Sequence, residues 1–168
     1  MDLNKTFLRV VLVYLVNLKS GTVFLARKAR KACKDKYNGF GGEIGLAEHA
    51  NEAAVRELKE ETGVDVCLED LQLRGKIEFV NIFSDGRRQT VDCFIYVATS
   101  WLGEITLKAD EAYDLQEFPI SALPFKQMED GDRDWVDVVL KGRKIKYGVL
   151  EKIWNGPIQH RNIEFDPN

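Results

Sequence analysis

Residues 39–64 read GFGGEIGLAEHANEAAVRELKEETGV, and the rest of the chain is organised around this stretch. Glu57, Glu60 and Glu61 stand at positions i, i+3 and i+4, so a helix would project all three carboxylates from nearly the same side. A second set of side chains would face a core: Ala54, Val55, Leu58 and Thr62. The stretch therefore predicts an amphipathic helix with an acidic face.

An acidic helix face has two interpretations. Like charges at i and i+4 destabilise a helix by roughly 0.2–0.5 kcal/mol per pair, so a compensating cation is expected nearby. A hard cation such as Mg²⁺ prefers carboxylate oxygens, keeps several waters and recruits substrate phosphates. For three acids on an arbitrary helix, however, a solvated charged face is the more common explanation.

The spacing of the surrounding residues favours the cation. Five residues separate Gly42 from Glu48, and seven more precede Arg56. The other fixed positions follow directly: Glu57-Leu58, Glu60-Glu61 and Gly63-Val64. So many specified positions are far more specific than a lone glycine pattern. The pattern resembles the Nudix box at every fixed position, which implies hydrolysis, dependent on Mg²⁺ or Mn²⁺, of a nucleoside diphosphate linked to a further group.

The resemblance implies a set of metal ligands. Glu57 and Glu61 would bind the metal, and Glu60 would be a further direct or water-mediated ligand. The glycine-rich turn would add a backbone carbonyl, from Gly42 or its neighbour Gly41. Glycine there also allows close backbone approach, and a simple tight turn between strand and helix is compatible with the same residues.

The resemblance also implies catalytic roles. Arg56 would orient the metal-binding glutamates. A carboxylate would take the proton of the attacking water, and Glu57 is the first candidate for this base. Glu111, which lies outside the box, is the second candidate, as a metal ligand or an acid/base group; otherwise it is an exposed loop glutamate.

Composition indicates an ordinary globular protein. The chain has 168 residues and a net charge of −3, so one domain spanning residues 1–168 is expected, without a basic footprint for duplex nucleic acid. Three widely spaced cysteines are typical of reduced thiols in a cytoplasmic protein. The apolar run Phe7–Val16 is too short to span a bilayer and lacks a good cleavage site, so no membrane partner is expected.

Hydrophobic periodicity predicts strands on both sides of the helix. The predicted strands are Phe7–Val16, Thr22–Ala26, Leu71–Phe83 (one or two), Gln89–Thr99, a short edge strand within Trp101–Lys108, Ile145–Ile153 and Ile158–Phe165. The predicted helices are Glu48–Thr62 and Arg133–Lys141. This order is typical of an α/β class with a mixed central sheet, and an α/β/α sandwich is also the Nudix fold.

A basic cluster directly precedes the glycine-rich loop. It contains Arg27, Lys28, Arg30, Lys31, Lys34 and Lys36. Such a cluster is often only a solvated loop, but beside a catalytic loop it could hold phosphates. The two readings are equally supported by the sequence.

Further segments resemble the oxidised-purine nucleoside triphosphatase branch of the Nudix superfamily, which includes MutT. These segments are Asn38–Gly42, Asp110-Glu111, Pro124–Met128, Asp132 and Trp135. The resemblance implies that Asn38 hydrogen-bonds a purine, that Phe40 belongs to the same substrate loop and that Asp132 reads the base edge. An asparagine in a turn and an aspartate capping the helix near Arg133 are the structural alternatives.

The chain departs from this branch at several positions. Glu129 stands where the branch has a stacking tryptophan, and Gly131 replaces a second base-reading aspartate. Glu43 replaces a lysine, and Ala32 replaces an aromatic residue. Stacking is worth about 1–3 kcal/mol per base in single-strand systems. These departures weaken the case for selectivity towards oxidised purines and leave the case for pyrophosphate chemistry unchanged.

The sequence thus predicts a Mg²⁺-dependent (or Mn²⁺-dependent) pyrophosphohydrolase of purine nucleoside triphosphates. Hydrolysis of ADP-ribose or a dinucleoside polyphosphate is the first alternative, although the chain lacks the proline and the tyrosine that mark those branches after the box. A non-catalytic nucleotide-binding regulatory module is the second alternative, and a complete box argues against it. The oligomeric state stays open.

Overall fold

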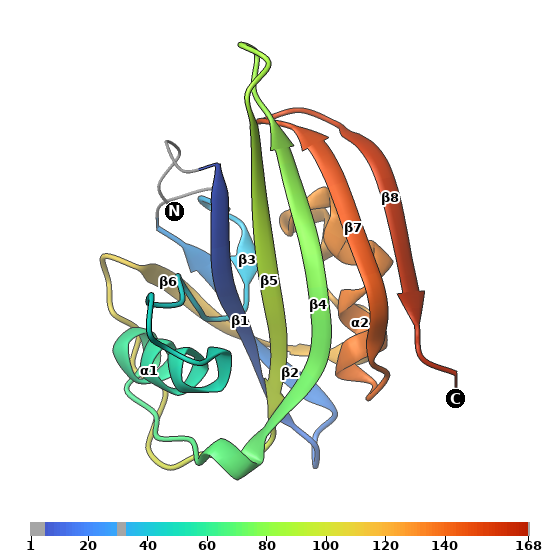
Figure 1. The fold of residues 1–168 in the computed structure, drawn as a ribbon. Coiled ribbons are helices and arrows are strands. Elements are labelled where there is room, and N and C mark those ends of the chain that lie inside the picture. Colours follow the sequence, from blue (N-terminus) through green and yellow to red (C-terminus); the bar gives the residue numbers. More distant parts are fainter. Residues whose placement is uncertain (1–5, 30–32, 168) are drawn as a thin grey trace.

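A computed structural model describes residues 6–29 and 33–167, and within them eight strands form one mixed sheet (Figure 1). The sheet order is β3-β2-β1-β5-β4-β7-β8, and β6 pairs with β2. The strands are β1 (Phe7–Asn17), β2 (Thr22–Lys28), β3 (Tyr37–Asn38), β4 (Leu71–Ile82), β5 (Arg88–Ala98), β6 (Ala112–Pro119), β7 (Ile145–Ile153) and β8 (Ile158–Phe165).

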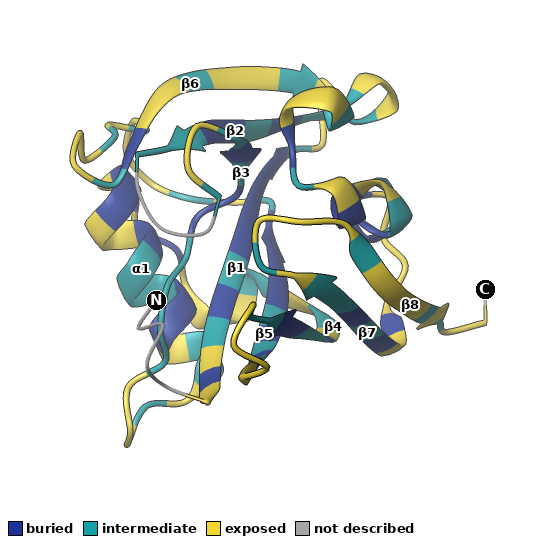
Figure 2. Cartoon of the chain, turned by 90° about the horizontal axis from the view of Figure 1, so that it is seen from above, coloured by how far each residue is buried: buried dark blue, intermediate teal, exposed yellow. Residues whose placement is uncertain are grey.

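Strand β1 divides the core into two halves. It pairs antiparallel with β2 and parallel with β5. Because successive side chains of a strand point to opposite faces, Val13 and Leu15 pack towards helix α1, whereas Tyr14 and Val16 join the other core. Figure 2 shows β1 and β5 buried and β6 and β8 largely exposed. The prediction of a buried strand in this segment is confirmed, and no helix of the described residues is long and apolar enough to cross a membrane.

Helix α1 (Ala50–Thr62) covers one face of the sheet. It buries Ala53, Ala54 and Leu58 against β1, and Gly63 ends it in the left-handed conformation, with φ of 73°. The predicted start at Glu48 is two residues too early. His49 has an extended backbone, and its N–H donates to the Glu52 carboxylate at 2.9 Å, which closes the first turn.

The opposite face has a thinner helical layer than predicted. Instead of one helix over Arg133–Lys141, the chain forms a 3-10 helix, η4 (Asp130–Asp134), and a short helix, α2 (Val136–Leu140). Trp135 separates them with φ of −147°, a value outside the helical range, and its fully buried ring packs edge-on to Tyr14. The prediction of an α/β fold with a mixed central sheet is confirmed.

One strand was placed wrongly from the sequence. No strand forms within the described segment 101–108; Ile105 and Leu107 pack beside the core under α1, and the edge strand is β6 instead. Strand β6 runs antiparallel to β2 and is mostly exposed. An edge strand with a polar outer surface carries little apolar periodicity, so its sequence reads as a loop. Two 3-10 turns, η2 (Ile120–Ala122) and η3 (Phe125–Gln127), follow it, and η1 (Leu68–Asp70) precedes β4.

Candidate active site

A cavity of about 570 Å³ lies between the acidic helix and η4. At one end its wall includes Gly42, Glu61 and Glu111, and at the other end Asn38 and Asp132. The floor comes from apolar side chains of the sheet: Val10, Leu12, Phe79, Val91 and Leu150. The cavity therefore brings together residues that are far apart in the sequence, and we name its two ends the carboxylate end and the base end.

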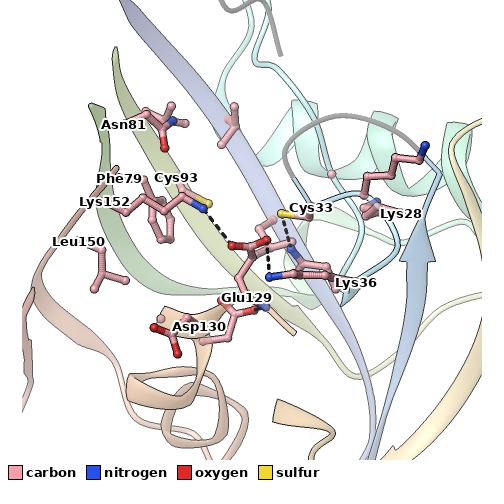
Figure 3. Close-up of a pocket in the computed structure, with 18 of the residues that line it drawn as sticks. Lys28, Cys33, Lys36, Phe79, Asn81, Cys93, Glu129, Asp130, Leu150 and Lys152 are labelled. Atoms are coloured by element: carbon pink, nitrogen blue, oxygen red, sulfur yellow. Dashed lines mark hydrogen bonds and ion pairs between the residues drawn. The ribbon is translucent and has the colours of Figure 1, made fainter. Parts of the chain in front are cut away.

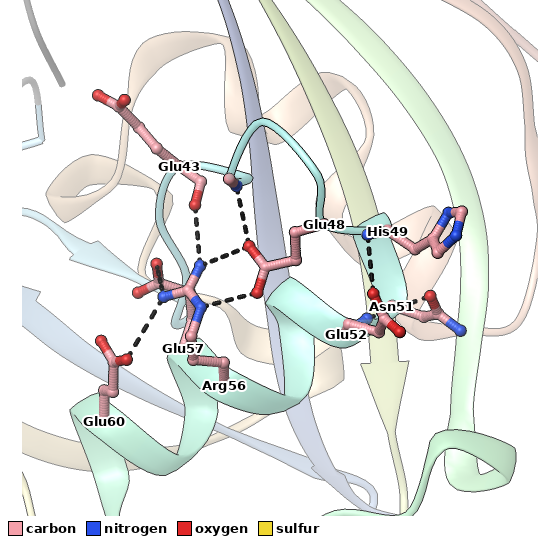
Figure 4. Close-up of polar contacts among 9 residues, drawn as sticks. Glu43, Glu48, His49, Asn51, Glu52, Arg56, Glu57 and Glu60 are labelled. Carbon is pink, nitrogen blue, oxygen red and sulfur yellow. Dashed lines mark hydrogen bonds and ion pairs between the residues drawn. The ribbon is translucent and has the colours of Figure 1, made fainter.

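Arg56 is the centre of a polar network at the start of α1 (Figure 4). Its Nε and Nη2 donate to the two oxygens of Glu48 at 2.8 and 3.0 Å, a bidentate pair. Its Nη2 also donates to the carbonyl of Glu43 at 3.0 Å, and its Nη1 donates to Glu57 at 2.8 Å. The hydrogen bond from Arg56 lowers the pKa of Glu48 to about 2. Arg56 thus lies where it can orient Glu57, as the resemblance implied.

Glu57 lies against the glycine-rich turn. A Cβ added at Gly42 would stand 2.5 Å from Glu57 Oε1, so only glycine leaves room for this carboxylate. Removal from water raises the pKa of Glu57, partly opposed by the hydrogen bond from Arg56, and Glu61 adds to the rise. The turn and the helix are therefore fitted to each other around one carboxylate.

Glu61 is buried, with 4% of its surface exposed. Its Oε2 accepts hydrogen bonds from Lys28 Nζ at 2.8 Å and from the Gly41 N–H at 3.2 Å. Glu60 differs: its side chain is 53% exposed, and Arg56 Nη1 approaches it at 3.5 Å. The predicted ligands therefore form an inner pair, Glu57 and Glu61, and an outer residue, Glu60.

The residues fit a hard divalent cation. The donors are carboxylate oxygens on one helix face, and the missing side chain of Gly42 leaves space beside Glu57. Among the described residues, no three His, Cys, Asp or Glu side chains already converge as a complete metal cluster. Protein cations hold the inner pair instead, Arg56 at Glu57 and Lys28 at Glu61.

Glu111 lies just before β6 and lines the same cavity. Its carbonyl accepts the N–H of Ala29 at 2.9 Å, and its own N–H donates to Lys108 at 2.9 Å. These backbone bonds fix the loop beside the start of the basic cluster. The structure therefore brings the second candidate base to the cavity that holds Glu61.

At the base end, Asn38 is held in a defined orientation. Its Oδ1 accepts the N–H of Gly39 at 2.8 Å and the hydroxyl of Tyr14 at 3.3 Å. Its Nδ2 donates weakly to Cys33 Sγ at 3.7 Å. The amide thus stands in the cavity wall, and among the described residues its donor side faces only a weak acceptor.

Asp132 does not cap a helix that begins near Arg133, because it lies within η4. Its Oδ2 accepts the N–H of Glu129 at 3.1 Å, which closes the first turn of η4. The same residue is 5% exposed and lines the cavity. Burial raises its pKa to about 7, and the nearby negative charge of Glu129 adds to the rise. A Cβ added at the neighbouring Gly131 would lie 2.9 Å from Leu150 Cδ1, so the leucine side chain would have to shift.

The structure places Phe40 elsewhere than the substrate loop role requires. Its side chain is fully buried in the core under α1 and is not part of the cavity wall. Its backbone pairs with Val13 through two hydrogen bonds of 2.7 and 2.9 Å. A side chain locked into the core supports the loop from behind, so the prediction of Phe40 as a substrate contact is corrected to a packing role.

The basic cluster divides between the two readings. Lys28, Lys34 and Lys36 line the cavity. Arg27 instead points to Asp114 on β6, at 3.0 Å, and stacks over the ring of Tyr37. Arg30, Lys31 and Ala32 lie outside the described residues.

Sequence reasoning missed two residues of the cavity wall, one on β4 and one on β7. Lys152 of β7 and Asn81 of β4 both line it (Figure 3). The available signal was the alternation of side chains along β7. Lys152 stands two residues after buried Leu150, so it lies on the face where an apolar residue is expected. Without knowledge of which strands are neighbours, that signal could not be connected to the box.

Comparisons with known proteins agree with this geometry. The NUDIX domain family matches residues 6–139. The oxidized purine nucleoside triphosphate hydrolase of Danio rerio is 33% identical over 138 residues, covering 82% of this chain and 84% of that protein. The Mus musculus protein of the same name is 30% identical over 127 residues, covering 76% of this chain and 77% of that protein.

A structural relative supports the same fold. The crystal structure of a mutator MutT protein from Bacillus halodurans aligns with a TM-score of 0.76 and 22% identity, over 94% of this chain and 97% of that one. A MutT Nudix hydrolase from Burkholderia pseudomallei aligns with a TM-score of 0.67 and 19% identity, over 82% and 98%. With the family match, the complete box and the cavity beside it, the chain belongs to the Nudix hydrolase family.

Proposed function

We propose that this protein is a single-domain, Mg²⁺-dependent pyrophosphohydrolase that cuts purine nucleoside triphosphates to the monophosphate and pyrophosphate. One observation carries the proposal: a single cavity joins Glu61 and the Gly41-Gly42 turn of the Nudix box to Asn38 and Asp132. Its volume of about 570 Å³ suits a nucleotide-sized ligand. The relatives named for oxidised purine triphosphates support the same substrate class.

Each end of the cavity has its own task. A bound Mg²⁺ would neutralise the diphosphate and lower the pKa of water. Glu57 and Glu61 would hold the cation with a carbonyl of the Gly41-Gly42 turn, and Glu60 would assist from the outer side. Lys28 would be released from Glu61 to meet phosphate oxygens. Glu57, or failing that Glu111, would take the proton of the attacking water.

The base end would hold the purine. Asn38 can donate and accept hydrogen bonds, which suits a purine edge. A site that hydrogen-bonds a base rejects analogues lacking the matching group better than an apolar pocket does. We therefore expect Asn38 and Asp132 to select the base without taking part in the reaction.

A nucleotide panel with Mg²⁺ tests the proposal. We expect 8-oxo-dGTP and dGTP to give monophosphate and pyrophosphate, with kcat/KM values above those for dCTP and ADP-ribose. The Asn38→Ala variant should lose discrimination among bases and keep its Mg²⁺ affinity. Preference for ADP-ribose or a pyrimidine would refute the purine triphosphate assignment. Tight nucleotide binding without any hydrolysis would identify a regulatory module instead.

A further inference from the structure

Three charged side chains form a bridge across the base end of the cavity (Figure 3). Glu129 Oε2 accepts from Lys152 Nζ at 2.9 Å, and Glu129 Oε1 lies 3.2 Å from Lys36 Nζ. Lys152 comes from β7 and Lys36 from the loop before β3, so the bridge joins opposite walls. The side chains of Lys152 and Glu129 are 26% and 21% exposed, which places this bridge within the cavity wall.

The bridge leaves hydrogen-bond donors facing the cavity. Both oxygens of Glu129 are engaged, whereas each lysine ammonium has three N–H donors and uses one on Glu129. Within residues 6–29 and 33–167, the Asn38 amide nitrogen faces only the weak acceptor Cys33. The indole N–H of Trp135, a fully buried side chain in the cavity wall, has no hydrogen-bond partner in the same described part of the chain. A ligand rich in acceptors would satisfy these donors.

The bridge also carries a net positive charge. Two ammonium groups surround one carboxylate, so one positive charge is uncompensated within it. Asp130 also lines the cavity, but its side chain is mostly exposed and its carboxylate lies 3.6 Å from Arg133. Asp132 is the nearest buried acid, and its pKa of about 7 leaves it partly neutral near neutral pH. The base end therefore favours a ligand with negative charge as well as acceptors.

We propose that the base end selects a purine whose base carries two oxo groups and negative charge, a xanthine-type base, over a purine that presents an amino group. The proposal rests on the proposed function and specifies its substrate class. The xanthine base has oxo groups at C2 and C6 and is largely deprotonated at neutral pH. Lys36 and Lys152 would donate to these oxygens. The amino group of adenine would instead place a hydrogen-bond donor against the two lysine ammonium groups, which are also donors. A site built on hydrogen bonds rejects such a mismatch.

Steady-state kinetics with XTP, ITP, GTP and ATP test this selectivity. We expect kcat/KM to be highest for XTP and lowest for ATP, by about tenfold to a hundredfold, the value of a hydrogen bond to a charged group. Lys152→Met should lower kcat/KM for XTP by about the same factor and change that for ATP little. Lys152→Arg, which keeps the charge and donors, should restore most of the preference.

Glu129→Gln gives a test of opposite sign. Removing the negative charge leaves both lysines uncompensated, so the ratio of kcat/KM for XTP over ITP should rise. Lys141→Met is the matched control. Lys141 does not line the cavity, and its Nζ lies 2.7 Å from Asp137 Oδ2. This variant should leave all four kcat/KM values unchanged.

The outcomes separate this selectivity from the proposed function. If wild-type protein hydrolyses no triphosphate, the proposed function fails. If kcat/KM for GTP and ATP equals that for XTP, only the xanthine selectivity is refuted. The same holds if Lys152→Met lowers kcat/KM equally for all four nucleotides. An equal loss for all four would show that Lys152 meets a phosphate or supports the fold.

Discussion

The carboxylate end of the cavity takes most of its residues from one continuous stretch, the turn at Gly41-Gly42 and helix α1. The base end takes its residues from four separate segments, around Cys33, Asn81, Asp132 and Lys152. The first end is formed by one helix and one turn packed together, and it matches the Nudix box at every fixed position. The second end is assembled by the topology of the sheet. We therefore propose that reaction and selectivity are carried by different elements.

This division can be tested by substituting residues at one end and measuring properties of both. A change at the carboxylate end should alter the rate and metal affinity, and leave the relative preference among bases unchanged. A change at the base end should alter preference or stability and leave Mg²⁺ affinity unchanged.

The largest effect is expected for Glu57→Gln. If this carboxylate is the base, its loss should lower kcat by about 10²–10⁴-fold. Pyrophosphate release measures the rate, and Glu61→Gln should weaken Mg²⁺ binding in calorimetry with the fold intact. Glu52→Gln, which keeps the acceptor for the His49 N–H, is the control on the same helix. Wild-type activity in Glu57→Gln would exclude this residue as base or ligand.

Gly42→Ala should have the next largest effect. The added Cβ would stand 2.5 Å from Glu57 Oε1 and push the carboxylate away. A misplacement of about 1 Å is enough to lower the rate by about 10²-fold. Gly45→Ala is the control in the same loop, where the nearest atom to the added Cβ is 3.3 Å away. Equal rates for the two variants would show that Glu57 does not depend on the turn.

Asp132→Asn should change the pH dependence of stability. The folded pKa of about 7 is above the value of 3.8 expected for the unfolded chain. At a pH between these two values, the folded state therefore binds a proton that the unfolded state has lost. Stability from this group is therefore greatest at low pH and falls as pH rises through that window. The fall is about 1.4 kcal/mol per pH unit, or about 2 kcal/mol between about pH 5 and pH 6.5.

Urea titrations across that window measure this change. The asparagine keeps an acceptor for the Glu129 N–H, so the variant should lack the decline and retain the cap. Parallel pH profiles for wild type and variant would mean that Asp132 titrates normally. Mg²⁺ affinity should be the same in both proteins.

The smallest effect is expected for Glu48→Gln. The side chains of Glu48 and Arg56 are 19% and 37% exposed. Because the ion pair is partly exposed, its loss should lower the free energy of unfolding by about 1 kcal/mol at neutral pH. The folded pKa of about 2 is below the usual value of 4.5, so this stability is complete above the unfolded pKa and is lost as pH falls towards about 2. Denaturation at neutral and acid pH should show the difference between the proteins shrinking at acid pH.

The same division explains what could be predicted from the sequence. The box residues were readable because helix geometry converts spacing directly into a shared face, as Glu57 and Glu61 show. Strand β1 was readable from its run of strand-forming apolar residues, and β5 from its alternation. Strand β6 was not, because an exposed edge lacks that alternation. Lys152 could not be assigned to the cavity, since its position depends on the parallel pairing of β7 with β4.

The predictions for single residues failed where packing decided the outcome. Phe40 belongs to the predicted loop, but its side chain turns into the core under α1. The helix near Arg133 is interrupted because Trp135 is buried beside Tyr14 with a non-helical backbone. Neither result follows from local propensity, because the tertiary contact outweighs it.

The parallel pairing of β1 with β5 also bears on how the chain folds during synthesis. Phe7 of β1 pairs with Thr90 of β5. The acidic helix therefore lies within the segment of chain that this pairing closes into a loop. Non-local strand pairing is slow, because loop-closure entropy must be overcome before the contacts form. While the chain leaves the ribosome, α1 emerges before β5, and its apolar side chains have only an incomplete sheet to cover them. Until the later strands arrive, this exposed apolar surface makes the nascent helix prone to aggregation.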